Sequence, residues 1–276
     1  MSNLRIVYNN VSDRSSVVAS STAGTLVASN VLTDRKSDTW RSVGTSATLT
    51  FTYATAEFVG CVITPFCNLT SGATIRVRTY TETSDPTPIE DSGVVAACAS
   101  TPLGLWEWGN VPLGVNAYSY GGANYGRVWF NTQPVKKVVV DIVDTSNTSG
   151  YIELSRVVMG GYFSPENDAE LDASTEVIET SKSERNDATD LITDLGGKSK
   201  KISFNLSHMT PSDRNSVTNI LKGNGVSRPI FLSLYPNSTD PSEEQLYQIW
   251  GKLSQQSSVT MAYWNAYSTT ITIEES

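Results

Sequence analysis

The chain has 276 residues, with 20 lysines and arginines against 28 aspartates and glutamates, and its formal net charge is −8. An acidic chain lacks the basic stripe that nucleic-acid binding requires, so we expect no specific nucleic-acid partner. No apolar run approaches the roughly 18–20 residues that span a bilayer, and the N-terminus lacks the pattern of an export signal. We therefore expect neither membrane insertion nor secretion by the usual route.

Hydroxyl side chains dominate the composition. Serine and threonine together contribute 67 residues, whereas charged residues make up only 17% of the chain, against about 25% in a typical protein. Threonine, valine and tyrosine favour β-strands. The 39% hydrophobic content is enough for a core, so the composition predicts a folded, mainly β protein.

The charge is distributed unevenly and indicates a domain boundary. Residues 1–162 have a net charge of −1, and residues 163–276 have a net charge of −7, with ten acidic residues between 163 and 194. Glycine and proline breakers at 160–165 coincide with this change. We expect one domain over 1–162 and a second over 163–276.

The first region reads as a series of short strands. Residues 48–53 and 74–80 alternate apolar and polar side chains, which is typical of strands with one buried face. Residues 58–63 and 135–143 are continuously apolar and β-branched, as expected for strands covered on both faces. Turn-forming clusters separate the strands, and no convincing helix is present, so we predict a jelly-roll β-sandwich.

Three stretches of this region resemble the galactose-binding-like, or discoidin-like, family. Residues 28–34 with 37–42 are similar to that family's early loop and tryptophan-containing strand entry. The pair 49–53 and 59–63 resembles its core strands, and 150–160 resembles its closing strand. Members of the family often hold a structural cation in the early loop, where only Asp34 and Asp38 carry carboxylates. Two carboxylates do not by themselves define a cation site, so no metal is expected.

A glycine- and aromatic-rich stretch lies between residues 103 and 130. It has three possible roles: a platform that stacks on sugar rings, a contact with a neighbouring subunit, or a loop folded over its own end of the sandwich. The candidate platform residues are Trp106, Trp108, Tyr118, Tyr120 and Tyr125.

The second region predicts a small α+β domain. Thr210-Pro211-Ser212-Asp213 has the pattern of a helix N-cap with an approximate capping box, and Val217, Ile220 and Leu221 follow at helical spacing. Strands are expected at 201–206, 229–235, 245–253 and 269–274. A strand–helix–strand order favours one helix laid on a β-sheet.

This second region resembles the tail-tube-like module of distal tail and baseplate proteins of tailed bacteriophages. The matching segments are 194–197 leading into 201–206, the helix headed by 211–214, the proline-led strand 229–236, and 248–253. The resemblance implies a non-enzymatic virion structural protein at the tail tip, made in the host cytoplasm. Such a protein would form a homo-oligomeric ring, a hexamer or a trimer, and dock other phage tail proteins.

The alternative function is a carbohydrate-binding module that attaches the particle to a host-surface glycan. The acidic stretch also has two interpretations: a solvated face, or acids that line a lumen or face a partner. The residues considered for the second are Glu166, Asp168, Glu170 and Asp172.

Enzymatic and redox functions have little support in the sequence. The one histidine, His208, has no GxSxG nucleophile motif to accompany it, and no phosphate-binding glycine motif is present. We expect no enzyme and no cofactor. Cys61, Cys67 and Cys98 form no CxxC pair and are expected to be buried free thiols. A Cys61–Cys67 disulfide is the alternative.

Overall fold

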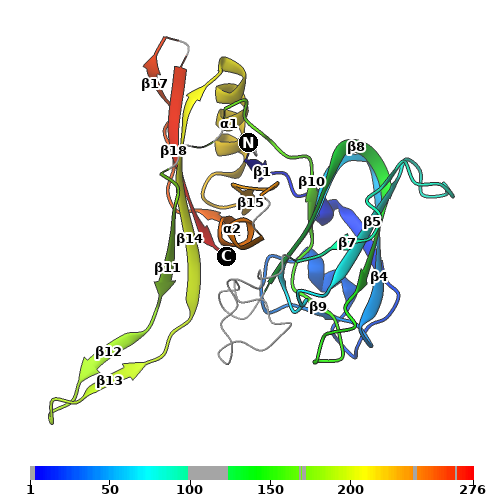
Figure 1. Cartoon of the computed structure of the whole chain (residues 1–276), viewed down its shortest axis with the longest axis horizontal. Coiled ribbons are helices and arrows are strands. Elements are labelled where there is room, and N and C mark those ends of the chain that lie inside the picture. The colour runs from blue at the N-terminus through cyan, green and yellow to red at the C-terminus, as the bar shows by residue number, and fades with distance from the viewer. Residues whose placement is uncertain (1–3, 99–123, 168, 170–171, 239–240, 265) are drawn as a thin grey trace. The chain divides into compact units, whose positions relative to one another are not determined.

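The computed structural model describes residues 4–98, 124–167, 169, 172–238, 241–264 and 266–276. The chain forms two compact units. The first comprises Met1–Pro165 and Ile230–Gln248, and the second comprises Glu166–Pro229 and Ile249–Ser276. Strands dominate both, so the expected mainly β class is confirmed (Figure 1).

Strands are the main regular elements of the first unit. Within its described residues the helices are two short 3-10 helices, η1 (Val11–Arg14) and η2 (Ala28–Leu32), and the α-helix α2 (Pro241–Leu246). Its strands are β1 (Arg5–Val7), β2 (Ser15–Ala19), β3 (Trp40–Arg41), β4 (Ser46–Cys67), β5 (Thr74–Tyr80), β6 (Glu90–Asp91), β7 (Val95–Ala96), β8 (Asn124–Val143), β9 (Glu153–Leu154), β10 (Val158–Gly160) and β15 (Ile230–Ser233).

Two long antiparallel strands, β4 and β8, organise this unit into a sandwich. The first half of β4 pairs with β2 and with the second half of β8, which in turn pairs with β5. The second half of β4 pairs with the first half of β8 and with β10. Register shifts between Thr52 and Glu57 and between Val59 and Cys61 separate the two halves. Each long strand therefore contributes to both layers.

The core of the sandwich lies between these layers. Leu49, Phe51 and Tyr53 on β4 are buried, as their alternation predicts, and they join one cluster with Val138 and Val140 of β8. Trp40 is fully buried, and its indole N–H donates to the Ser21 carbonyl at 3.1 Å. That bond satisfies the one polar atom of the ring, which allows complete burial.

The second unit is the expected smaller α+β body. In its sheet, β18 lies between β16 and β14, β11 pairs with the other edge of β14, and β17 pairs with β18. Helix α1 lies along this sheet, against β14 and β18 (Figure 1). The elements are β11 (Ser174–Glu179), β12 (Lys182–Arg185), β13 (Leu191–Asp194), β14 (Lys198–Met209), α1 (Pro211–Asn224), β16 (Gln248–Leu253), β17 (Thr260–Tyr263) and β18 (Ala266–Glu275).

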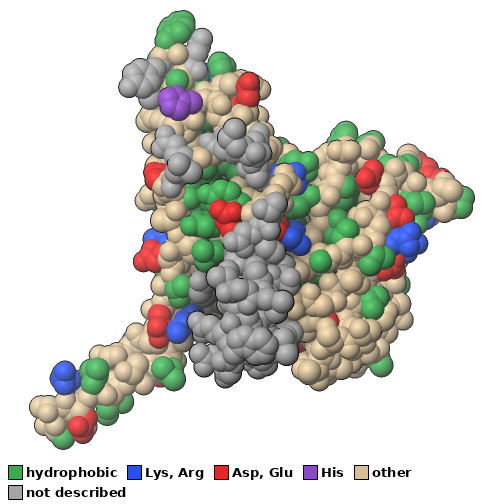
Figure 2. Space-filling view, in the orientation of Figure 1, with side chains coloured by type: hydrophobic (Ala, Val, Ile, Leu, Met, Phe, Trp, Pro, Cys, Tyr) green, Lys and Arg blue, Asp and Glu red, His purple; other side chains and the backbone are tan. Residues whose placement is uncertain are grey.

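Some element boundaries differ from those expected. The strand expected over 245–253 begins only at Gln248, because α2 extends to Leu246. The segment 150–160, expected to form one closing strand, contains two short strands, β9 and β10. The described residues of the acidic stretch 163–194 contain three strands. Two of them, β12 and β13, form an exposed hairpin whose apolar side chains face solvent (Figure 2). No helix among the described residues is long and apolar enough to cross a membrane.

Candidate functional site

The first unit contains a polar cleft with a volume of about 730 Å³. Its walls come from β1, from the segment around β6 and β7, from the first half of β8, and from the segments that carry Tyr162 and Asn237. Trp129 and Tyr162 supply aromatic rings, and Arg5, Arg127 and Asp91 supply charged groups. The cleft therefore combines flat apolar faces with hydrogen-bonding groups.

Arg5 contacts residues from three separate segments of this cleft. Its guanidinium carbon lies 4.9 Å from the ring centroids of both Trp129 and Tyr162. These two rings meet edge to face, with centroids 5.4 Å apart and planes at 83°. Arg5 Nη2 also donates to Asn237 Oδ1 at 3.3 Å. The cation–π contacts and this bond hold the guanidinium in one orientation.

Two buried donors in the cleft have no partner. Within the described part of the chain, neither Arg5 Nη1 nor Trp129 Nε1 makes a hydrogen bond, although both atoms are buried. An unsatisfied buried donor costs about 1–3 kcal/mol. A ligand that displaces the groups covering these two nitrogens and brings acceptor oxygens to them would recover that free energy.

The cleft also contains a carboxylate, that of Asp91, which neighbouring donors keep ionised. Arg76 Nε and Nη2 donate to Asp91 Oδ1 and Oδ2 at 2.9 and 2.5 Å. These bonds, with a further one from the Gly93 backbone N–H, lower the pKa of Asp91 to about 2. Asp91 is thus a fixed carboxylate near neutral pH.

Tyr125 is the described member of the aromatic platform expected from the sequence. Trp106, Trp108, Tyr118 and Tyr120 lie outside the described residues. Tyr125 is described, and its ring is only 3% exposed. It packs near Phe66 and Phe231, at centroid distances of 5.7 and 6.3 Å. Its ring therefore has no open face for a sugar, in contrast to the surface role proposed from the sequence.

The acidic candidates of the second unit take part in local contacts. The backbone N–H of Glu166 donates to Asp213 Oδ2 at 3.3 Å. Asp172 accepts a hydrogen bond from the side-chain amide of Asn205. Asp168 and Glu170 fall outside the described residues. His208 is exposed at the bulge of β14 (purple in Figure 2).

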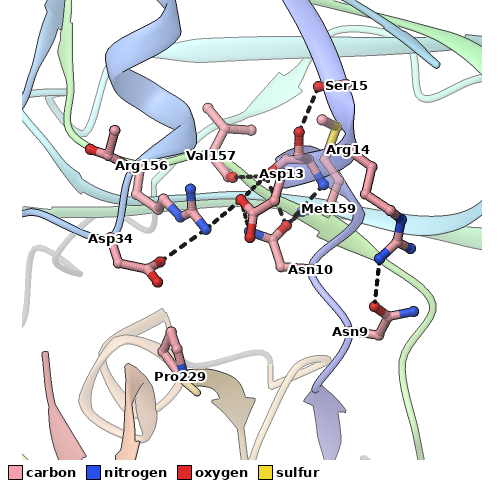
Figure 3. Close-up of polar contacts among 12 residues, drawn as sticks. Asn9, Asn10, Asp13, Arg14, Ser15, Asp34, Arg156, Val157, Met159 and Pro229 are labelled. Carbon is pink, nitrogen blue, oxygen red and sulfur yellow. Dashed lines mark hydrogen bonds and ion pairs between the residues drawn. The ribbon is translucent and has the colours of Figure 1, made fainter. Parts of the chain in front are cut away.

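The two cation candidates in the early loop have other contacts. Asp34 Oδ1 lies 2.9 Å from Arg156 Nη2, which also lies 2.6 Å from Asp13 Oδ1 (Figure 3). The Asp34 carboxylate is therefore already paired with a guanidinium. Asp38 accepts a 3.4 Å hydrogen bond from the Thr33 hydroxyl. In the described residues, no cluster of three or more His, Cys, Asp or Glu residues could hold a metal ion.

The sequence did not identify the residues that form the cleft. Trp129 lies inside the aromatic-rich stretch, so this stretch was the one sequence feature that pointed toward the cleft. Arg5, Tyr162 and Asn237 occur in short segments without a motif, and each reaches the cleft through long-range contacts. Residues this far apart in sequence give no spacing pattern, so only the fold brings them together.

No protein-family model matches the sequence, and no curated protein matches it either. Chitosan-binding module 1 from a chitosanase/glucanase of Paenibacillus sp. IK-5 is 14% identical, over 55% of this chain and 99% of that chain, with a TM-score of 0.38. CBM32-5 of Clostridium perfringens, in complex with GalNAc-β-1,3-galactose, is 6% identical over 55% and 100%, with a TM-score of 0.40.

A third solved structure, the lectin domain of lectinolysin complexed with Lewis B antigen, is 14% identical. It covers 55% of this chain and 95% of that chain, with a TM-score of 0.37. The identities are low and the TM-scores lie below 0.5, so these likenesses do not define the function of this chain.

Proposed function

We propose that the first unit is a carbohydrate-binding module and that its cleft around Arg5, Trp129 and Tyr162 holds the sugar. The observation that carries this proposal is the pair of buried, unpartnered donors, Arg5 Nη1 and Trp129 Nε1, beside two aromatic rings. Sugar hydroxyl and ring oxygens accept such bonds, and the apolar face of a sugar ring packs on an aromatic ring. The carboxylate of Asp91 can accept from sugar hydroxyls in return.

The proposal is tested by titrating the full chain with a panel of soluble oligosaccharides. We expect at least one glycan to bind, and Trp129→Phe to weaken it about tenfold, because the variant keeps an aromatic ring but loses one N–H bond. Arg5→Gln should weaken it by about ten- to one-hundredfold, since bonds from a charged donor are stronger.

The matched control is Arg214→Gln in the second unit. Arg214 also lies over an aromatic ring, 4.6 Å from the centroid of Tyr267, but it lies in the other unit. Its substitution should leave glycan affinity unchanged. A wild-type chain that binds nothing on the panel, or affinities equal in all three variants, would rule the proposal out.

We infer that the first unit has a galactose-binding-like fold. Its two-layer antiparallel arrangement supports this inference, as does the pairing of β10 with the second half of β4, where the resemblance places a closing strand. The buried Trp40 at the expected strand entry is also consistent with it.

As a second candidate, we propose that the chain is a structural component of an assembly, as a phage tail protein would be. The hairpin β12–β13 favours this, because all eight strand residues are exposed. Leu191, Ile192 and the following Leu195 are among the exposed large apolar side chains, Leu195 at 84%. A two-stranded hairpin is marginally stable alone, so contact with a second molecule would stabilise it.

Sedimentation of the purified chain tests this second candidate. A mass of several subunits is expected, together with a lower mass when Leu191, Ile192 and Leu195 are all replaced by serine. Val226→Ser is the control, because Val226 is also exposed in the second unit but lies outside the hairpin. A wild-type monomer, or an unchanged mass in the triple variant, would exclude the hairpin as the contact.

A further inference from the structure

The second unit contains an open groove beside helix α1, here called the α1 groove, with a volume of about 620 Å³. Residues of α1 line it together with Met261 and Tyr267, which are paired across strands β17 and β18. Met261 is 60% exposed. The apolar side chains of the lining are Leu221, Leu253, Val259 and Met261. The α1 groove therefore offers apolar surface that a partner can cover.

Both charged residues of this lining, Arg214 and Lys222, are basic. Arg214 Nη1 donates to the Tyr267 hydroxyl at 2.9 Å, and its Nε and Nη2 donate to Asn215 Oδ1 at 3.2 and 2.8 Å. These bonds hold the guanidinium beside the groove. Lys222 is exposed in the last turn of α1. A partner that fits the α1 groove is therefore both apolar and acidic.

The hairpin β12–β13 carries this complementary chemistry. Residues 186–195, here called the tip segment, contain three aspartates and no lysine or arginine. The same segment carries Leu191, Ile192 and Leu195, which are 60%, 58% and 84% exposed. The bases of the hairpin lie on β12, and one of them, Arg185, donates to the Thr189 carbonyl at 2.7 Å. The tip segment therefore presents aliphatic side chains among negative charges.

A chain cannot place this hairpin in its own α1 groove. The hairpin comes just before the Lys198 end of β14, whereas the groove lies near the other end, where Met209 pairs with Tyr267. Strand β14 has 12 residues, and a strand rises about 3.3 Å per residue, so its ends lie roughly 36 Å apart. Strands β12 and β13 have only four residues each. Figure 1 shows the hairpin and α1 at opposite ends of the second unit.

We propose that the tip segment of one chain docks in the α1 groove of a second copy of this chain. This inference rests on the second candidate function, in which the hairpin is an assembly contact, and it names the surface that receives the hairpin. The aliphatic side chains of the tip segment pack on Leu221 and Met261, and its aspartates face Lys222. Opposite charges of this kind favour encounter and set the register of the contact.

The proposed contact is heterologous, because the hairpin and the α1 groove are different surfaces of the same chain. A heterologous contact leaves one hairpin and one groove unused in every open assembly, and only a closed ring uses all of them. Two variants that each lose a different half of the contact are therefore complementary, which an isologous contact does not allow.

Sedimentation of two such variants tests the inference. The groove variant combines Lys222→Glu with Met261→Glu, and the hairpin variant replaces Leu191, Ile192 and Leu195 by serine. All five positions are exposed, so both variants should fold, and thermal unfolding of each checks this. We expect each variant alone to have a lower mass than wild type. An equimolar mixture should form a complex with one copy of each, since each supplies the half that the other lacks.

A charge exchange tests the pairing of the two surfaces directly. Lys222→Glu alone should raise the concentration needed for half-assembly about tenfold, because the aspartates of the tip segment then meet a like charge. Adding Asp190→Lys and Asp194→Lys to that variant should restore assembly. Val226→Ser is again the control, because Val226 belongs neither to the hairpin nor to the lining of the α1 groove.

The outcomes separate this inference from the candidate function on which it rests. A groove variant with the wild-type mass, or a mixture that does not associate, would overturn the α1 groove as the receiving surface while the hairpin remains an assembly contact. An unchanged mass in the hairpin variant, or a wild-type monomer, would instead remove the second candidate function and this inference with it.

Discussion

At the scale of single residues, Arg127 and Glu244 form an ion pair within the first unit. Arg127 Nε lies 2.7 Å from Glu244 Oε1, and Arg127 Nη2 contacts the other carboxylate oxygen. Their side chains are 18% and 3% exposed. Arg127 also donates to the Ala97 carbonyl at 3.3 Å, so it keeps a partner if the carboxylate is lost, whereas Glu244 would lose its counterion.

The burial of this pair predicts unequal effects of its two partners on stability. Arg127→Met should lower the free energy of unfolding by about 3–5 kcal/mol, because it leaves a buried carboxylate without its counterion. Glu244→Gln should cost less, about 1–3 kcal/mol, since the guanidinium keeps a carbonyl partner. Urea denaturation of the two variants measures both values.

The exposed pair Lys198–Glu179 serves as the control, with a 3.9 Å contact and side chains 57% and 45% exposed. Glu179→Gln should cost about 0–1 kcal/mol. Equal losses in Arg127→Met and Glu179→Gln would contradict the role given to burial.

Lys200 of β14 gives a pH dependence with a definite sign. Burial lowers its pKa to about 8 from 10.5, and the nearby Glu275 charge opposes this only in part. Between these values the unfolded chain binds more protons than the folded chain, so this residue makes stability rise with pH over that window. Below pH 8, the charged lysine is buried at a cost that stays constant.

The comparison of wild type with Lys200→Met isolates this effect. We expect the variant to be the more stable at pH 7 and its advantage to shrink as the pH rises from about 8 to 10.5. Thermal unfolding at several pH values measures the difference. A constant difference across this range would show that Lys200 does not titrate as its burial requires.

At the scale of elements, helix α1 is stabilised at its N-terminus by a reciprocal capping box. The Thr210 hydroxyl accepts from the Asp213 N–H at 3.2 Å, and Asp213 Oδ2 accepts from the Thr210 N–H at 3.4 Å. Thr210→Ala should lower the free energy of unfolding by about 1 kcal/mol. Ser212→Ala, at an exposed first-turn position, should change it by less than about 0.5 kcal/mol. Chemical denaturation distinguishes the two, and similar values would argue against the cap.

The same elements show what the sequence could predict. The beginning of α1 was predicted correctly because its capping box depends on two residues only three positions apart, Thr210 and Asp213. Gly225, with φ at 51°, caps the C-terminal end of the helix. The length of β4 was not predicted. Residues 54–56 are small and exposed, so the apolar pattern breaks there, while the backbone continues through a register shift. Pairing with β8 decides that continuation, and no local pattern records it.

At the scale of the whole molecule, residues 230–248 belong to the first unit although they follow most of the second in sequence. Strand β15 pairs with β1, with Ile6 opposite Leu232. The Gln245 side-chain amide donates to the Tyr125 carbonyl at 3.1 Å. This return could not be predicted from composition or charge, because both change near residue 162 and neither changes again at 230 or 248. Asn237, which accepts a hydrogen bond from Arg5 in the cleft, lies in this returning segment.

This arrangement predicts that a fragment of residues 1–165 is incomplete. Without 230–248, β1 loses its partner β15, Arg127 loses Glu244 and the Tyr125 ring loses its contact with Phe231. The fragment should therefore melt well below the first transition of the full chain and bind the dye ANS through its exposed apolar surface.

Joining 230–248 to the fragment 1–165 through a flexible glycine–serine linker should restore a cooperative transition and abolish ANS binding. The matched control carries the same linker followed by 230–248 with Phe231→Ser and Leu232→Ser, two buried β15 positions, and should not be rescued. A fragment 1–165 as stable as the linked chain would show that the returning segment contributes nothing to the first unit.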